Sequence, residues 1–70
     1  MRFAVVIERA GGNLAAYVPD LPGCVATDPD RGAVFQVIRE GIKTHLAGMT
    51  EDGAPVPEPK AIIEYVVTAV

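Results

Sequence analysis

The 70-residue sequence predicts one α+β domain, residues 1–70, with the element order β-β-β-α-β and one helix packed on a four-stranded mixed sheet. Apolar and polar residues alternate near both ends of the chain, which is the period of a half-buried strand. Between them, apolar residues recur at three- and four-residue steps, which is the period of an amphipathic helix. Clusters of Gly and Pro separate these segments.

The first strand is predicted at residues 2–10, because Phe3, Val5 and Ile7 share one face of it. The sequence Ala10-Gly11-Gly12-Asn13 then forms a turn of the kind that closes a hairpin. The first two strands are therefore expected to pair in an antiparallel hairpin.

The second strand is predicted at residues 14–18 and is apolar on both faces. Residues 19–23 contain two prolines and a glycine, which break regular structure. A short third strand is predicted at residues 24–27.

The helix is predicted to begin at Asp28 as the N-cap, with Pro29 in the first helical position, and to end at Gly53. Gly41, on the apolar side, is expected to let the helix approach the sheet closely. The remaining apolar residues form a stripe along the helix: Val34, Val37, Ile38, Ile42, Leu46 and Met49.

The last strand is predicted at residues 61–70, after an extended connector with proline at every second position. We expect it to lie beside the first strand, giving the strand order 3-2-1-4 with the helix on one face. Because half of the residues are hydrophobic, the uncovered face is expected to be buried in a homodimer or tetramer. That face carries Ala4, Val6, Ile62, Val66 and Val70.

The composition excludes several classes of function. With 6 Lys and Arg against 9 Asp and Glu the net charge is −3, which disfavours non-specific binding to nucleic acid. The single cysteine, Cys24, allows no disulfide within the chain and fits a reducing cytoplasm. No signal peptide precedes the first strand, and residues 61–70 are too short to span a membrane. We therefore expect a soluble cytoplasmic protein.

No catalytic residue, metal ligand or cofactor site is predicted. One Cys and one His cannot form a Cys/His zinc site, and a nucleophilic pair of Cys24 with His45 is less favoured than a buried thiol and a helix residue at the edge of the core. The element order β-β-β-α-β resembles the start of the ribonuclease H-like fold, whose enzymes bind magnesium through several acidic residues. A residual nuclease using Glu8, Glu40 and Glu64 is kept as an alternative, although nothing in their positions makes them converge.

Several motifs together resemble the HicB antitoxin family. The run Tyr17-Val18-Pro19-Asp20-Leu21-Pro22-Gly23-Cys24 is similar to the family signature "vPdlPGc", and Val6-Ile7-Glu8 is similar to its opening strand. The helix residues Glu40-Gly41-Ile42 resemble "EAI", and residues 51–59 resemble "e.G.piP.P". The resemblance covers nearly the whole chain.

The resemblance implies a degraded ribonuclease H-like fold without catalytic acids. It also implies a non-enzymatic antitoxin that binds a basic HicA-like toxin, an mRNA-cleaving ribonuclease, and covers its active-site histidine and its RNA surface. The acidic charge agrees with a basic partner. The exposed acids Asp20, Asp28, Asp30 and Glu40 are the expected toxin contacts, with turn stabilisation as the other role expected of Asp20.

The chain departs from the family pattern at two places. Arg31 and Gly32 stand where the family has glutamates near the helix start. No DNA-binding domain follows the last strand in this sequence, so binding to an operator is not expected. An orphan oligomeric protein without a toxin remains an alternative.

Overall fold

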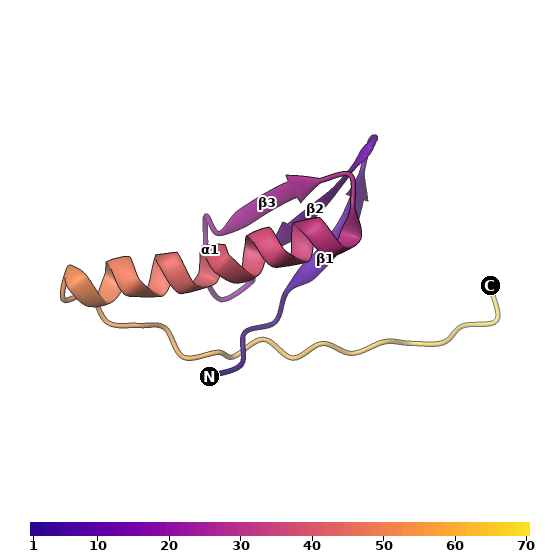
Figure 1. Cartoon of the computed structure of the whole chain (residues 1–70). Helices are drawn as coiled ribbons and strands as arrows, with labels where there is room; N and C mark the ends of the chain where they lie inside the picture. Colours follow the sequence, from indigo (N-terminus) through magenta and orange to yellow (C-terminus); the bar gives the residue numbers. More distant parts are fainter.

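The computed structural model describes residues 1–70 and contains one antiparallel sheet and one helix (Figure 1). The sheet has the order β1-β2-β3, so the three strands form a meander. The elements are β1 (Val6–Ala10), β2 (Asn13–Tyr17), β3 (Val25–Asp28) and α1 (Arg31–Glu51). The α+β class and the first four predicted elements are confirmed.

The helix begins two residues later than predicted. Asp30 is the N-cap, and its Oδ2 accepts a hydrogen bond from the backbone N–H of Ala33 at 2.8 Å. Asp28 cannot cap the helix, because it is still paired with Leu14 in the sheet. Its Oδ1 accepts instead from the N–H of Asp30 at 2.9 Å, so the two aspartates together direct the chain from β3 into α1.

The helix ends as predicted, at a glycine. Gly53 has a φ of 71° and donates its N–H to the carbonyl of Thr50 at 3.2 Å. Ala54 donates to the carbonyl of Met49 at 2.9 Å. These two bonds form a Schellman motif, which satisfies carbonyl groups that the helix end would otherwise leave free.

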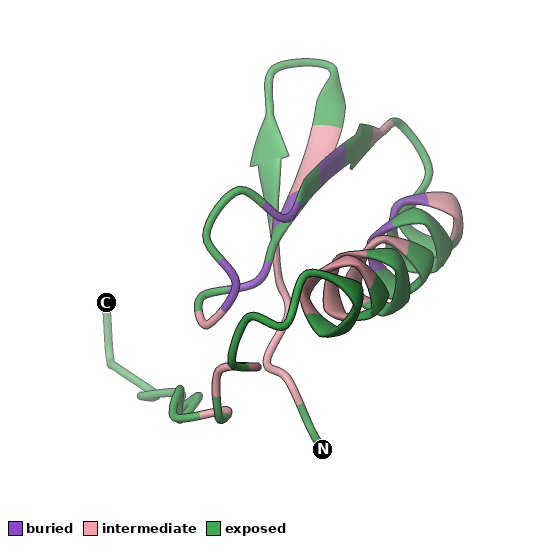
Figure 2. Cartoon of the chain, turned by 90° about the vertical axis from the view of Figure 1, so that its left-hand side faces the viewer, coloured by how far each residue is buried: buried purple, intermediate pink, exposed green.

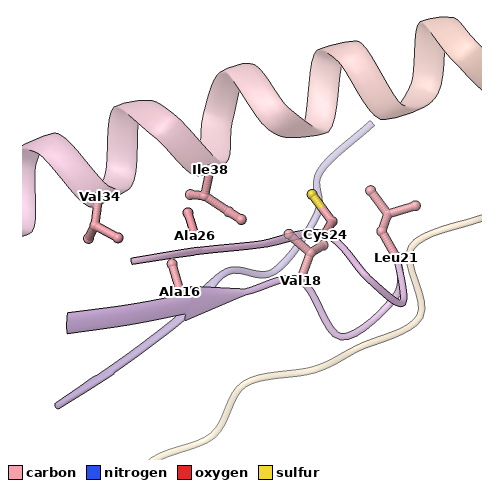
Figure 3. Packing of buried hydrophobic residues seen from close by; sticks show 7 residues of the cluster. All are labelled: Ala16, Val18, Leu21, Cys24, Ala26, Val34 and Ile38. Atoms are coloured by element: carbon pink, nitrogen blue, oxygen red, sulfur yellow. The ribbon is translucent and has the colours of Figure 1, made fainter. Parts of the chain in front are cut away.

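The core lies between α1 and the face of β2 and β3 that α1 covers (Figures 2 and 3). Val34 and Ile38 descend from the helix onto Ala16 and Ala26, whose small side chains leave room for them. Gly41 is not required for this approach, because a Cβ there would lie 3.8 Å from Cys24 Sγ, an ordinary contact.

The predicted helix stripe is correct except at Val37. Ile42 and Leu46 are half-buried and pack against the core, and Met49 is half-buried as well. Val37 is 53% exposed, because it lies on the side of α1 turned away from the sheet.

The predicted fourth strand and mixed sheet are wrong for the single chain. Residues 61–70, here called the tail, are extended but pair with no strand, and every one of them is exposed (Figures 1 and 2). The connector leads the tail past the start of β1 without hydrogen bonding to it, so no sheet edge receives its backbone. β1 consequently remains an unpaired edge of the sheet.

No helix combines the length and the apolarity needed to cross a membrane.

Candidate protein-binding site

The loop between β2 and β3 consists of two consecutive tight turns. Leu21 donates its N–H to the carbonyl of Val18, and Cys24 donates to the carbonyl of Leu21, both at 3.0 Å. A proline occupies the second position of each turn, where its fixed φ fits. Gly23 has a φ of 86°, which a type II turn requires at its third position. The conformation of the loop is therefore specified by its own sequence.

Two residues of this loop contact different parts of the molecule. Leu21 is 1% exposed and extends into the core, which makes it one of the largest fully buried side chains (Figure 3). Asp20 is half-buried, and its Oδ2 accepts hydrogen bonds from the backbone N–H groups of Lys60 and Ala61, at 3.1 Å each. Asp20 thus holds the start of the tail, a segment 40 residues away in sequence, and does not stabilise its own turn.

The other predicted contact acids lie at separate places on the surface. Asp28 and Asp30 hold the helix start, as described above. Glu40 is exposed and forms an ion pair with Lys43 Nζ at 3.4 Å. It lies ten residues beyond Asp30, roughly 15 Å along the helix axis. Asp20 lies at the opposite end of β3 from Asp28, so the four acids do not form one cluster.

The three glutamates considered for a nuclease are not brought together. Glu8 lies in β1 opposite Ala15, on the sheet face away from α1, and Glu64 lies on the exposed tail. Nowhere in the chain do three or more His, Cys, Asp or Glu side chains gather in a way that could hold a metal ion.

Cys24 is buried in the core, and this burial raises the pKa of its thiol. No hydrogen bond joins it to His45, which is half-buried on α1. The structure therefore contains no nucleophile–base pair at this place.

The uncovered face of the sheet carries a row of apolar side chains. Val6 is paired with Tyr17 and Tyr17 with Val25, so the three lie side by side across the strands. Val25 is 68% exposed. Of the residues predicted for this face, Ala4 lies just before β1 and Val6 lies in it, and both are half-buried. Ile62, Val66 and Val70 are on the tail and do not reach the sheet.

An open apolar groove lies between α1 and β1. It consists of two adjoining hollows of about 480 and 490 Å³ that share Val5 and Phe35. It exists because α1 packs on β2 and β3 and not on β1. Its apolar lining is Met1, Phe3, Val5, Ile7, Phe35 and Ile42. The sequence reading missed Phe35, although its spacing of seven residues from Ile42 places both on one side of the helix.

The tail and β1 face one another across a second hollow, here called the slot. One part, of about 330 Å³, lies between Phe3 and Ala4 on one side and residues 61–63 on the other. The next part, of about 470 Å³, opens over Val5, Ile7, Arg9 and Leu14 on the helix side of the sheet and is bordered by Arg31 of α1 and by Tyr65 of the tail. The tail therefore runs in the same direction as β1 but apart from it.

Basic side chains border the groove and the slot. Every Lys and Arg of the chain except Lys60 lines one of these hollows: Arg2, Arg9, Arg31, Arg39 and Lys43. This side of an acidic protein therefore carries most of its basic side chains, with Glu40 paired to Lys43 at its border.

Comparison with known proteins identifies the family of the chain. The family described as "HicB_like antitoxin of bacterial toxin-antitoxin system" matches residues 3–69. The chain is also similar to an uncharacterised 14.9 kDa protein in the rep-hol intergenic region of Haemophilus phage HP1, with 29% identity over 66 residues. That match covers 94% of this chain and 50% of the phage protein, so the chain spans half the length of this relative. No solved structure matches the chain.

Proposed function

Because this chain belongs to the HicB-like antitoxin family, we propose that it is the antitoxin of a type II toxin–antitoxin pair and blocks a small basic HicA-like toxin that cleaves mRNA. The observation that carries the proposal is the family match over residues 3–69. In this role the protein acts in the cytoplasm by binding, without catalysis of its own.

The charge of the chain supports a basic partner. Its net charge of −3 favours the approach of a basic toxin, since complementary charge speeds association and selects against acidic competitors. In the proposed complex the antitoxin covers the active-site histidine and the RNA-binding surface of the toxin. The antitoxin blocks these parts of the toxin without contacting RNA itself.

The proposed toxin contacts are Asp20, Asp28, Asp30 and Glu40. Glu40 is the most informative of them, because its only partner is the exposed Lys43, and an exposed ion pair contributes only about 0–1 kcal/mol to stability. Asp30 also caps the helix, so the test variant is Asp30→Ser, which removes the charge and retains a good N-cap.

We also propose that the protein is a homo-oligomer. The uncovered sheet face and the tail together supply the apolar surface for it: Ala4, Val6, Ile62, Val66 and Val70. The exposed row of Val6, Tyr17 and Val25 supports this assignment, because it is continuous across the three strands.

Co-expression with the small basic protein encoded beside this chain tests the antitoxin function. The expected result is relief of growth arrest and a complex that elutes as one peak. Glu40→Lys and Asp30→Ser should weaken that complex about tenfold each, whereas the control Glu51→Lys, an equally exposed acid at the helix end, should not.

Two outcomes contradict different parts of the proposal. If growth is not restored and no complex elutes, the chain is not the antitoxin of that protein. The alternative of an orphan oligomeric protein without a toxin is then favoured. If a complex forms but Glu40→Lys and Asp30→Ser behave like Glu51→Lys, the antitoxin function stands and the contact assignment is wrong.

A further inference from the structure

We propose that the slot between β1 and the tail is the binding site for the tail of a second copy of this chain, so that two copies exchange tails and build one continuous sheet. The tail of each copy pairs with β1 of the other. This inference rests on the proposed homo-oligomer and not on the antitoxin function.

Both walls of the slot have unsatisfied backbone. β1 is an edge strand, and the tail is extended without a pairing partner. Exposed edges of this kind readily accept another strand. The tail makes no hydrogen bond with β1 of its own chain, so it does not pair with this edge. A further strand would enter the part of the slot that lies between Phe3 and Ala4 on one side and residues 61–63 on the other.

The tail has the length and pattern of the missing strand. Its alternate residues Ile63, Tyr65 and Val67 belong to a row that contains no polar residue, whereas the other row contains Glu64 and Thr68. In a paired strand the wholly apolar row faces the groove beneath α1, where Phe35 and Ile42 are partly open. The other row then continues the uncovered face of the sheet.

The charges of the two parts are complementary. Glu64 is the only charged side chain among residues 61–70. The slot is bordered by Arg2, Arg9 and Arg31. An incoming tail therefore brings one carboxylate to the edge that Arg2 borders, whereas Arg9 and Arg31 lie on the side of the sheet that α1 covers, opposite to Glu64.

The exposed area matches what a dimer buries. A folded monomer of this mass is expected to expose about 4,200 Å², and the chain exposes 5424 Å². The excess of about 1,200 Å² exceeds the ~800 Å² that each partner buries in a standard interface. The tail contributes much of it, because Ile62, Tyr65 and Val67 are 81%, 90% and 97% exposed.

Twofold symmetry fixes the direction of the exchanged strands. The tail runs in the same direction as β1 of its own chain, as the order of contacts along the slot shows. Two tails related by a twofold axis perpendicular to the sheet run antiparallel. Each tail is then antiparallel to the β1 it joins, and the strand order is β3-β2-β1-tail-tail-β1-β2-β3 across the dimer.

The decisive variant is the double substitution Tyr65→Asp with Val67→Asp. Both side chains are almost fully exposed in the single chain, so the substitutions leave its fold intact but place two charges in the proposed interface. Sedimentation should show a dimer for the unaltered protein and a dissociation constant raised roughly 100-fold or more for the variant. The matched control is Val37→Glu, which places an acid on the exposed side of α1, outside the slot.

A second measurement identifies which chain supplies the strand. In dimers mixed from isotope-labelled and unlabelled copies, nuclear Overhauser effects should join β1 of one copy to the tail of the other. The tail amides should be protected from hydrogen exchange in the unaltered protein and not in the double variant.

Every other outcome overturns the exchange. A monomer with protected tail amides means that the tail pairs with its own β1, and a monomer with unprotected amides means that it pairs with nothing. A dimer that survives the double substitution but dissociates with Val25→Asp is joined through the uncovered sheet face alone.

Discussion

Asp20 shows how one side chain connects parts of the molecule that are distant in sequence. Its place between two prolines suggested a turn residue, and the two tight turns themselves were predictable from Pro19, Pro22 and Gly23. Its hydrogen bonds to Lys60 and Ala61 were not predictable, because local sequence carries no signal for an acceptor 40 residues away. The residue is thus less available for a partner than its exposed loop position implied.

Replacing Asp20 with Ala should release the start of the tail while leaving the core intact. Loss of the shared acceptor is expected to speed hydrogen exchange at the amides of Lys60 and Ala61 about tenfold, corresponding to roughly 1.4 kcal/mol. Asp20→Asn keeps an acceptor oxygen and serves as the control. If exchange in Asp20→Ala is as slow as in the unaltered protein, the carboxylate does not hold the tail.

Cys24 should make stability depend on alkaline pH. Burial raises the pKa of the thiol in the folded state, so the folded protein retains its proton at a pH where the unfolded chain loses it. The stabilisation is complete below the ordinary thiol pKa of ~8.5 and is lost as the pH rises toward the folded-state value. Urea unfolding between pH 7 and 10 should show this decline.

The Cys24→Ala variant isolates the contribution of that thiol. It should lack the part of the alkaline decline that Cys24 causes, at a cost of about 1 kcal/mol in neutral solution from lost packing. An identical pH profile for both proteins would contradict the assignment. A thiol reagent should also react slowly with native Cys24 and quickly after unfolding.

At the scale of elements, periodicity predicted the buried residues and the end of α1 well. It predicted the sheet that α1 covers less completely. Val34 and Ile38 are the buried centre of the predicted stripe, and Gly53 ends the helix as expected. Val37 belongs to the predicted stripe because of its three-residue spacing from Val34, yet it is 53% exposed. With three strands present, the core is narrower, and the groove on the β1 side leaves Phe35 partly exposed.

Two glycines within α1 should be replaceable with a gain in stability. A Cβ at Gly41 meets only an ordinary contact and one at Gly48 meets nothing within 4 Å. Gly41→Ala and Gly48→Ala should therefore each raise the free energy of unfolding by about 1 kcal/mol. Gly53→Ala is the opposing control, since the φ of 71° there should make it destabilising by about 1–2 kcal/mol. Chemical denaturation measures all three.

At the scale of the whole molecule, the composition predicted a surplus of apolar surface. Seven of 70 residues are buried, too few to absorb a chain that is 50% hydrophobic. The sequence also located part of the surplus correctly, in residues 61–70. It could not establish what those residues pair with, because strand pairing is nonlocal and the alternation of one strand does not name its neighbour.

An exchanged dimer should show a melting temperature that rises with protein concentration. Association stabilises the folded state by mass action, so each tenfold increase in concentration should raise Tm by about 3–5 °C. Calorimetry at several concentrations checks this. The Tyr65→Asp and Val67→Asp double variant should melt at one temperature throughout, and a concentration-independent Tm for the unaltered protein would contradict the dimer.

The distribution of the core along the chain has a consequence for the order of events in time. All buried residues lie between Ala16 and Ile38, and β1, β2 and β3 are joined by short connections, so folding needs few distant contacts. During synthesis the N-terminal part emerges first. The sheet and helix therefore need nothing from the tail in order to fold, and in the proposed exchange the tail pairs in a later step whose rate depends on protein concentration.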